Sequence, residues 1–218
     1  MPNLKTRLNE FLDSSNLIIQ TSLTDEQIKQ AAGVYGYDEA KLQAGKRLYD
    51  EFFALYNQQK KEYGEQIEAT EEVHTAWDAA NQLYMKTLKI ARVAFQKVSR
   101  TDREVIVSGT RKRTLVGWLE QTKVFYTNLL ADTELLTEMA KFGYPKEKLA
   151  AEYQLVQDLD QKRIKQNQES SEAEEATRAR DQKIHELDDW ISDYRVVLKV
   201  ALTETPQKLE RLGIKVRG

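Results

Sequence analysis

The apolar residues of the chain recur every three, four or seven positions over long stretches, which is the spacing of one face of an α-helix. The phase of this pattern holds from residue 38 to residue 97 and again from 146 to 203. Each stretch predicts one long helix, and the first would measure about 90 Å at the helical rise per residue. Two shorter helices are predicted ahead of the first long one. They are residues 3–20 and a helix that Thr24 caps and that stops near Gly36.

The pattern also repeats along the chain at a fixed distance. Gly36-Tyr37 recurs as Gly143-Tyr144, a shift of 143 − 36 = 107 residues, and this shift holds without a gap from residue 8 to residue 95. It aligns identical residues in several places: Lys41 with Lys148, Leu42 with Leu149, Ala44 with Ala151, Ala69 with Ala176, and Thr70 with Thr177. We therefore predict a tandem duplication, with one helical repeat in residues 1–109 and a second in residues 110–218.

The register of the two repeats changes after residue 95. Residues 101–109 align with residues 205–213, a shift of 205 − 101 = 104, and both segments begin with threonine and end with glycine. Taken alone, Val105-Ile106-Val107 is typical of a short strand. The terminal threonine and glycine favour a short helix in both places, because these residues suit an N-cap and a C-terminal stop. Two short extended segments are the alternative.

The middle of each predicted long helix is poor in apolar residues, over 57–66 and 161–183. Two arrangements fit this composition. The long helices either stay unbroken and cross antiparallel with a small bundle at each end, or fold back near Gly64 and Ser170-Ser171 into two four-helix bundles. We favour unbroken helices, because one glycine inside a helix costs only about 1 kcal/mol. The predicted fold is all-α, a tandem duplication with long antiparallel helices and four-helix-bundle-like ends. The two repeats are expected to pack as one pseudo-twofold unit.

The composition narrows the possible functions. There is no cysteine, which excludes disulfides, thiol nucleophiles and thiolate metal sites, and the formal charge of −2 provides no overall field for nucleic acid or acidic membranes. No stretch approaches the length of a membrane span, and the amphipathic start lacks an apolar signal core. We expect a cytoplasmic protein without a membrane partner. A secreted protein whose signal peptide is missing from the sequence is the alternative.

Two histidines provide the best candidates for metal binding. Glu71 and His74 have the Glu-x-x-His spacing that places two ligands on one helix face in di-iron bundles. The second repeat has Arg178 and Asp181 at the equivalent positions, which does not fit a paired metal site. We therefore expect a solvated helix face, with Glu71, His74 and His185 as weak candidates for a carboxylate and histidine metal site.

One basic cluster, near the junction of the repeats, is the candidate for nucleic-acid binding. Its central residues are Arg111, Lys112 and Arg113, and Arg100 and Arg103 precede them. Nucleic-acid binding normally needs a basic face over a whole domain, so we treat contact with nucleic acid as a weaker alternative. The corresponding segment of the second repeat carries its own basic residues: Lys208, Arg211, Lys215 and Arg217.

No nucleophile with an adjacent base, phosphate-binding loop or cofactor motif is present in the sequence. We therefore expect neither an enzyme nor a cofactor. The expected function is that of a non-catalytic helical scaffold or protein-interaction protein, which binds a protein partner or a second copy of itself.

Four segments resemble a loosely defined group of uncharacterised bacterial all-helical proteins with an internal tandem duplication. The segments are residues 36–42, 60–66, 89–94 and 206–214. The resemblance implies an all-helical fold, and the group carries no activity that it could imply.

Overall fold

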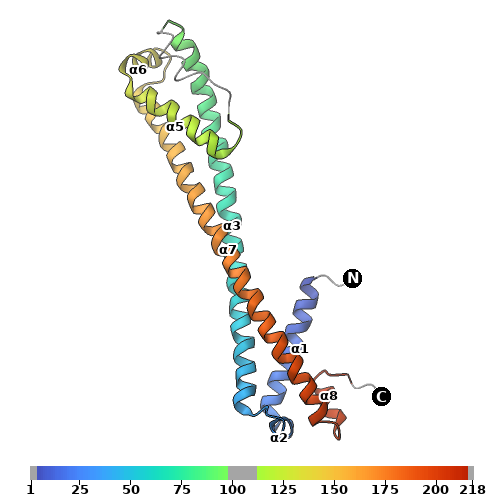
Figure 1. Cartoon of the computed structure of the whole chain (residues 1–218). Coiled ribbons are helices and arrows are strands. Elements are labelled where there is room, and N and C mark those ends of the chain that lie inside the picture. Colours follow the sequence, from blue (N-terminus) through green and yellow to red (C-terminus); the bar gives the residue numbers. More distant parts are fainter. Residues whose placement is uncertain (1–3, 98–111, 216–218) are drawn as a thin grey trace. The chain divides into compact units, whose positions relative to one another are not determined.

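The computed structural model of the chain describes residues 4–97 and 112–215, with side chains for residues 8–96 and 112–215. Within these residues every regular element is helical, which confirms the predicted all-α class (Figure 1). The elements are α1 (Leu4–Thr24), α2 (Glu26–Gly33), α3 (Glu39–Ala94), the 3-10 helix η1 (Phe95–Lys97), α5 (Leu115–Ala131), α6 (Thr133–Ala140), α7 (Lys146–Ala201) and α8 (Pro206–Arg211). The short helix predicted over 101–109 lies outside the described residues.

The long helices α3 and α7 are both unbroken over 56 residues. The arrangement with continuous helices is therefore confirmed, and the alternative in which they fold back near Gly64 and Ser170-Ser171 is wrong. The two helices run antiparallel. Gln66 donates a hydrogen bond to Ser170 (2.8 Å), and one turn later Thr70 accepts one from Gln166 (3.2 Å), so residue numbers rise on one helix as they fall on the other.

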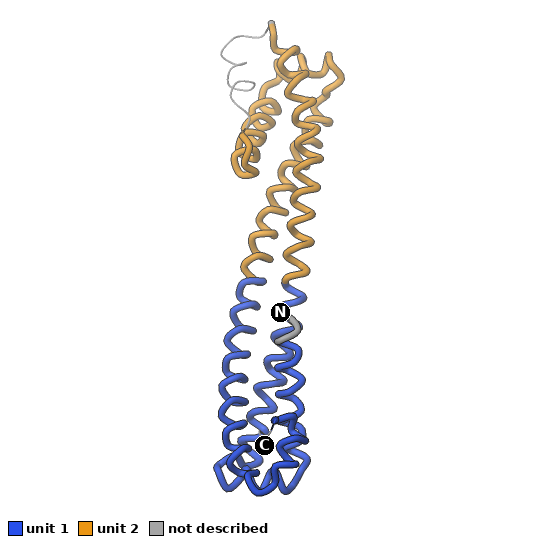
Figure 2. The backbone as a smooth tube through the Cα atoms, turned by 90° about the vertical axis from the view of Figure 1, so that its right-hand side faces the viewer, with its two compact units in different colours: residues 1–62, 173–218 blue, residues 63–172 orange. Residues whose placement is uncertain are grey.

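The chain forms two compact units, which Figure 2 shows in different colours. Unit 1 contains residues 1–62 and 173–218, and therefore α1, α2, the start of α3, the end of α7 and α8. Unit 2 contains residues 63–172, and therefore the rest of α3, η1, α5, α6 and the start of α7. Each unit takes residues from both of the predicted repeats.

Each unit has its own apolar core, built from the helical faces that the hydrophobic spacing predicts. The core of unit 1 includes Ile18, Ile19, Ile28, Leu42, Phe52, Leu187, Ile191, Tyr194 and Leu212. The core of unit 2 includes Tyr84, Phe95, Trp118, Phe125, Tyr126, Leu129, Leu149 and Leu159. Burial of large apolar side chains, at about 1.5–3 kcal/mol each, is the main stabilising contribution to both units.

Glycines end α2 and α6 in the way that the sequence predicts. Gly36 and Gly143 have φ angles of +80° and +76°, a region that glycine reaches without a steric penalty. The residue after each glycine donates its N–H back into the preceding helix, from Tyr37 to the Ala32 carbonyl (3.1 Å) and from Tyr144 to the Met139 carbonyl (3.2 Å). This is the Schellman arrangement, and it satisfies carbonyl groups that the helix end leaves unpaired.

The prediction that Thr24 caps the second helix is wrong. Thr24 is the last residue of α1, where its hydroxyl donates to the Gln20 carbonyl (2.9 Å). The cap is Asp25, whose side chain accepts from two backbone N–H groups of α2, and Asp132 caps α6 in the same way. A carboxylate is favoured here because it is a charged acceptor at the positive end of the helix dipole.

Asp25 also holds α8 against α2. Its carboxylate pairs with Arg211 (3.0 Å) and with Lys208 (3.5 Å). The backbone N–H of Ile28, together with these two cations, lowers the pKa of the Asp25 carboxyl below its ordinary value. The carboxylate therefore contributes to the packing of two helices as well as to the end of one.

We expect Asp25→Ala to lower the free energy of unfolding more than Asp132→Ala. Both variants lose an N-cap, at about 1 kcal/mol, but among the described residues only Asp25 also pairs with cations of α8. The lowered pKa means that this contribution is present above pH 3.8 and is lost as the pH falls through the folded-state value. Urea unfolding at pH 7 and pH 3 measures both effects. Equal losses for the two variants at pH 7 would contradict the account.

Candidate functional site

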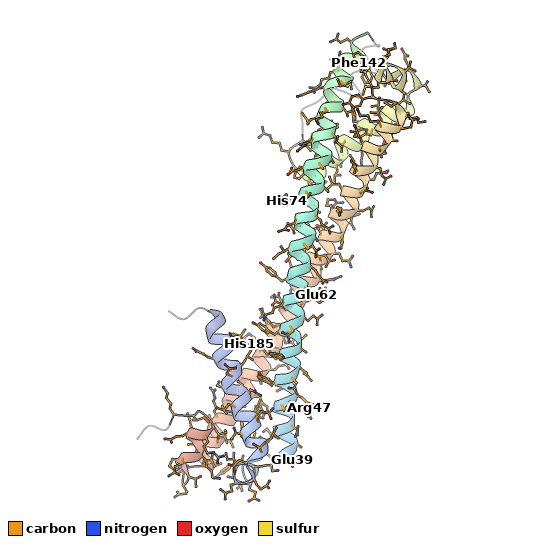
Figure 3. All side chains as sticks on the ribbon, turned by 180° about the vertical axis from the view of Figure 1, so that it is seen from behind. Glu39, Arg47, Glu62, His74, Phe142 and His185 are labelled. Carbon is orange, nitrogen blue, oxygen red and sulfur yellow. The ribbon has the colours of Figure 1, made fainter. Side chains whose placement is uncertain are left out.

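The residues predicted to bind a metal lie on exposed helix faces. Figure 3 labels His74 on α3 and His185 on α7, and both side chains are exposed, as is that of Glu71. Glu71 and His74 belong to unit 2, whereas His185 belongs to unit 1. Metal binding by these residues stays a prediction, which elemental analysis of protein purified without chelator, compared with His74→Ala, would test.

The basic cluster is described only in part. Lys112 and Arg113 are exposed just ahead of α5, while Arg111, with Arg100 and Arg103, lies outside the described residues. In the corresponding segment of the second repeat, Lys208 and Arg211 pair with Asp25, so both have a structural role. Nucleic-acid binding stays a prediction. It requires salt-dependent retention on DNA or RNA that is lost when Arg111, Lys112 and Arg113 become Glu.

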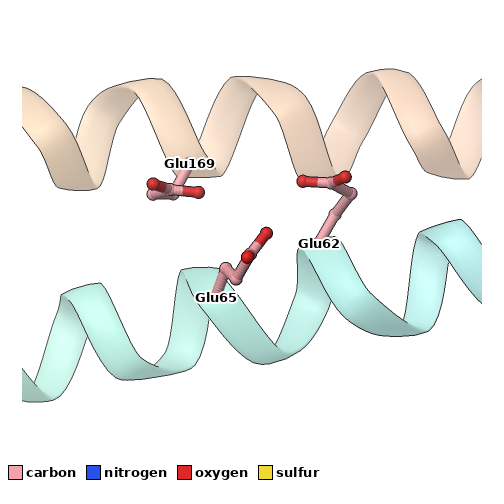
Figure 4. Close-up of side chains that lie close together, drawn as sticks. All are labelled: Glu62, Glu65 and Glu169. Atoms are coloured by element: carbon pink, nitrogen blue, oxygen red, sulfur yellow. The ribbon is translucent and has the colours of Figure 1, made fainter.

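Three carboxylates that the sequence analysis did not single out lie close together. Glu62 and Glu65 of α3 and Glu169 of α7 each place a carboxylate oxygen within 4.8 Å of the others (Figure 4). All three side chains are partly exposed. Acidic groups often gather at such positions without a metal ion, so this cluster by itself does not define a site.

The most unusual side chain in the described structure is a carboxylate inside the core of unit 2. Glu152 of α7 is only 6% exposed. Its Oε2 atom accepts hydrogen bonds from the Thr87 hydroxyl of α3 (2.6 Å) and from the Tyr126 hydroxyl of α5 (3.0 Å), and both of these residues are also buried. Burying a carboxylate is costly unless hydrogen bonds compensate it, so these two donors are essential to the packing of three helices.

The surroundings of this carboxylate are aromatic. The Tyr126 ring stacks on Tyr153 (5.8 Å between centroids) and meets Phe125 edge to face (5.0 Å). Burial, and then the neighbouring negative charge of Glu152, raise the pKa of the Tyr126 hydroxyl far above its ordinary value. Tyr126 therefore keeps its proton and acts as a hydrogen-bond donor. The arrangement orients a carboxylate, and it does not prepare Tyr126 as a nucleophile or base.

Unit 1 is packed differently at the position that corresponds to Glu152. The residue 107 positions before Glu152 is Gly45, and a Cβ atom placed there would overlap the indole ring of Trp190. Trp190 in turn packs on Tyr194 (5.0 Å between centroids), which stacks on Tyr37 (4.6 Å). In unit 1, the indole ring of Trp190 thus occupies the space that a side chain at position 45 would need.

Two hydroxyls in the core of unit 1 are poorly satisfied. The Tyr194 and Ser22 hydroxyls are both buried, and neither has a partner with proper hydrogen-bond geometry. Burial raises the pKa of Tyr194 to about 12, although the nearby Ser22 hydroxyl offsets part of this effect. These two hydroxyls therefore lack the paired donors and acceptor that surround Glu152 in unit 2.

Neither Glu152 nor Trp190 was predicted from the sequence, although one signal marked the glutamate. Glu152 lies in the apolar phase of α7, between Leu149 and Val156, and all three residues are buried. A charged residue at such a position predicts a compensated site in the core. Which hydroxyls would compensate it depends on contacts between distant segments, and the helical spacing does not determine these.

No known protein family, curated protein or solved structure matches the chain. The likeness to uncharacterised bacterial helical proteins therefore adds no family assignment beyond the all-helical fold. None of the described helices combines the length and the apolar character that a membrane span requires.

Tyr126→Phe is expected to lower the free energy of unfolding by about 1–3 kcal/mol, because the buried carboxylate loses one of its two donors. Tyr153→Phe is the matched control on the neighbouring ring. Its hydroxyl pairs with the exposed Thr127, and the loss should stay within about 0.5 kcal/mol. Urea unfolding followed by circular dichroism measures both variants. A cost for Tyr126→Phe no larger than the control would show that the pairing contributes little.

Stability is expected to fall at alkaline pH. Because the pKa of Tyr194 is raised from 10.0 to about 12, the unfolded chain loses this proton first, and rising pH between those values favours unfolding. Tyr194→Phe removes this contribution and should lose less stability between pH 8 and pH 11 than the parent protein. Tyr63→Phe, at an exposed position, serves as the control. Identical losses for Tyr194→Phe and the parent would refute this explanation.

Proposed function

We propose that the protein is a non-catalytic helical scaffold of the cytoplasm, built from two tandem repeats, that binds protein partners through surfaces present once in each unit. The described site residues agree with a role without catalysis, because the buried carboxylate of unit 2 is held by groups that keep their protons. The proposal rests on two further sets of observations, one on the repeats and one on the surface.

The bounds of the helices support the duplication. Helix α2 covers residues 26–33 and α6 covers 133–140, while α3 covers 39–94 and α7 covers 146–201, so each pair is offset by the same 107 residues as the sequence. The caps Asp25 and Asp132 and the turn glycines Gly36 and Gly143 keep this offset. Offsets that agree at caps, turns and helix ends are difficult to explain without a common origin of the two repeats.

The middle of the long helices supports a coiled-coil-like pairing of α3 with α7. The buried residues there are small: Ala69 and Val73 on α3, and Ala173 and Ala176 on α7. Polar pairs flank them, including Lys162 with Glu72 in unit 2 and Lys183 with Glu51 in unit 1. Small buried residues let helices approach closely, and the polar flanks keep the remaining surface in water.

The observation that carries the binding function is the recurrence of exposed apolar side chains. Three pairs related by the 107-residue shift are both at least 44% exposed: Leu17 with Val124, Tyr35 with Phe142, and Val93 with Val200. Each pair places one member in unit 1 and one in unit 2. Single exposed apolar residues are common, but retention at the same position of both repeats indicates a shared use, and protein contact is the usual one.

We expect replacement of all six residues by glutamine to weaken self-association or partner binding. A matched control replaces three exposed apolar residues whose counterparts at the 107-residue shift are polar: Phe53, Val116 and Ile164. Sedimentation velocity over a range of concentrations measures self-association, and pull-down with cross-linking identifies protein partners. The sixfold variant should weaken binding at least about tenfold, equivalent to 1.4 kcal/mol, while the control binds as the parent does.

Two results would refute the proposal. In the first, the parent chain is monomeric at all concentrations and captures nothing that the sixfold variant fails to capture. In the second, the control variant loses binding as severely as the sixfold variant, which would make the recurrence irrelevant. Urea unfolding of each variant ensures that a loss of binding is compared between folded proteins.

A further inference from the structure

The two predicted repeats differ sharply at two equivalent positions of their long helices. Gly45 of the first repeat corresponds to Glu152 of the second, and Leu83 of the first corresponds to Trp190 of the second. Both exchanges alter the volume of the side chain strongly, and one also introduces a charge. They are therefore larger than the apolar-for-apolar exchanges that the cores accept with little change.

In unit 1 the two differences fit each other. Gly45 comes from the first repeat and Trp190 from the second, and the indole ring lies where a Cβ atom on Gly45 would be. The first repeat thus provides an opening and the second repeat provides the side chain that fills it. Neither repeat contains both members of the pair.

In unit 2 the contact between the repeats is polar. Glu152 comes from the second repeat, and it accepts a hydrogen bond from Thr87 of the first repeat and another from Tyr126 of its own repeat. The position equivalent to Thr87 is Tyr194, and the position equivalent to Tyr126 is Ile19. The first repeat therefore supplies a threonine donor that the second repeat does not carry at the equivalent place.

We propose that the repeats have diverged into complementary halves, so that the interface between α3 and α7 accepts one copy of each repeat and rejects two copies of the same one. The partner that this surface fits is the opposite repeat, from the same chain or from a second copy of it. The inference depends on the duplication put forward above, and it does not depend on binding to any other protein.

Pairing between identical repeats would fail for physical reasons on both sides. Two first repeats would place Gly45 opposite Leu83, which leaves a void where Trp190 belongs. Two second repeats would place Glu152 opposite Trp190 and would put the much larger Tyr194 in the place of Thr87, and both changes crowd the core. The divergence therefore acts against the unwanted pairings as well as for the native one.

Single substitutions in the full chain reproduce each of these mismatches. Trp190→Leu places a leucine opposite Gly45 in unit 1, as in a pair of first repeats. The 107-residue shift relates the Gly45–Trp190 contact to positions 152 and 83, so Leu83→Trp, at a half-buried position of unit 2, is expected to bring an indole to Glu152, as in a pair of second repeats. Each variant has a compensating change at the opposite position, Gly45→Ala for the first and Glu152→Gly for the second. Gly45→Ala alone completes the first cycle, and Glu152→Gly alone completes the second.

The test is urea unfolding of the parent, the single variants and the two double variants. Each single variant should raise the unfolding equilibrium constant about tenfold or more, and each double variant should recover a large part of that loss. Gly64→Ala is the control for the change of a helical glycine on α3. Apart from the helix's own nearby backbone, none of the described residues has a heavy atom within 4 Å of the added methyl group there, and this variant should not raise the constant.

Additive effects in both cycles would overturn the inference, because the positions would then not recognise each other. A Leu83→Trp variant as stable as the parent would also overturn it, because two second repeats would then be compatible. Rescue by the double variants separates a specific mismatch from a general failure to fold. The unfolding measurements involve no partner protein, so they can succeed even where the proposed binding function fails.

Discussion

The pairing of α3 with α7 is the constraint on which the rest of the structure depends. Each helix is 56 residues long, and neither can bury its apolar stripe without a neighbour. Over the middle of their length the buried residues are small, such as Ala69 and Ala176, and polar groups flank them. The short helices α1, α2, α5, α6 and α8 add the large apolar residues that each compact unit needs.

Much of the fold could be predicted because it follows from local chemistry. The helical spacing and the glycines at 36 and 143 determine where helices run and stop, and neither depends on distant contacts. The choice of Asp25 over Thr24 as a cap was missed because both residues suit that position, and the difference lies in the charge and in the contact with α8. The exact bounds of the two units depend on which halves of the long helices pack together, and the helical spacing does not determine these contacts.

The same limit applies to the candidate site. The sequence contains a glutamate in an apolar phase of α7, but the hydroxyls of Thr87 and Tyr126 that compensate it come from two other helices. The histidines drew attention because of their chemistry, yet they occupy solvated faces. In a helical protein with wide polar faces, a reactive residue type is a weaker indication of a site than a polar residue at a buried position of the pattern.

The composition of the two units has a consequence for the order in which the chain folds during synthesis. Unit 2 is contiguous in the sequence, whereas unit 1 joins residues 1–62 to residues 173–218. The ribosome therefore releases everything unit 2 requires before the last part of unit 1 has been made. Of the described helices, α1 and α2 emerge first but wait longest for the end of α7 and for α8, with apolar residues such as Ile18 and Ile28 uncovered in the meantime. During translation, unit 1 is therefore the part of this protein whose apolar residues stay exposed longest, because it is the unit completed last.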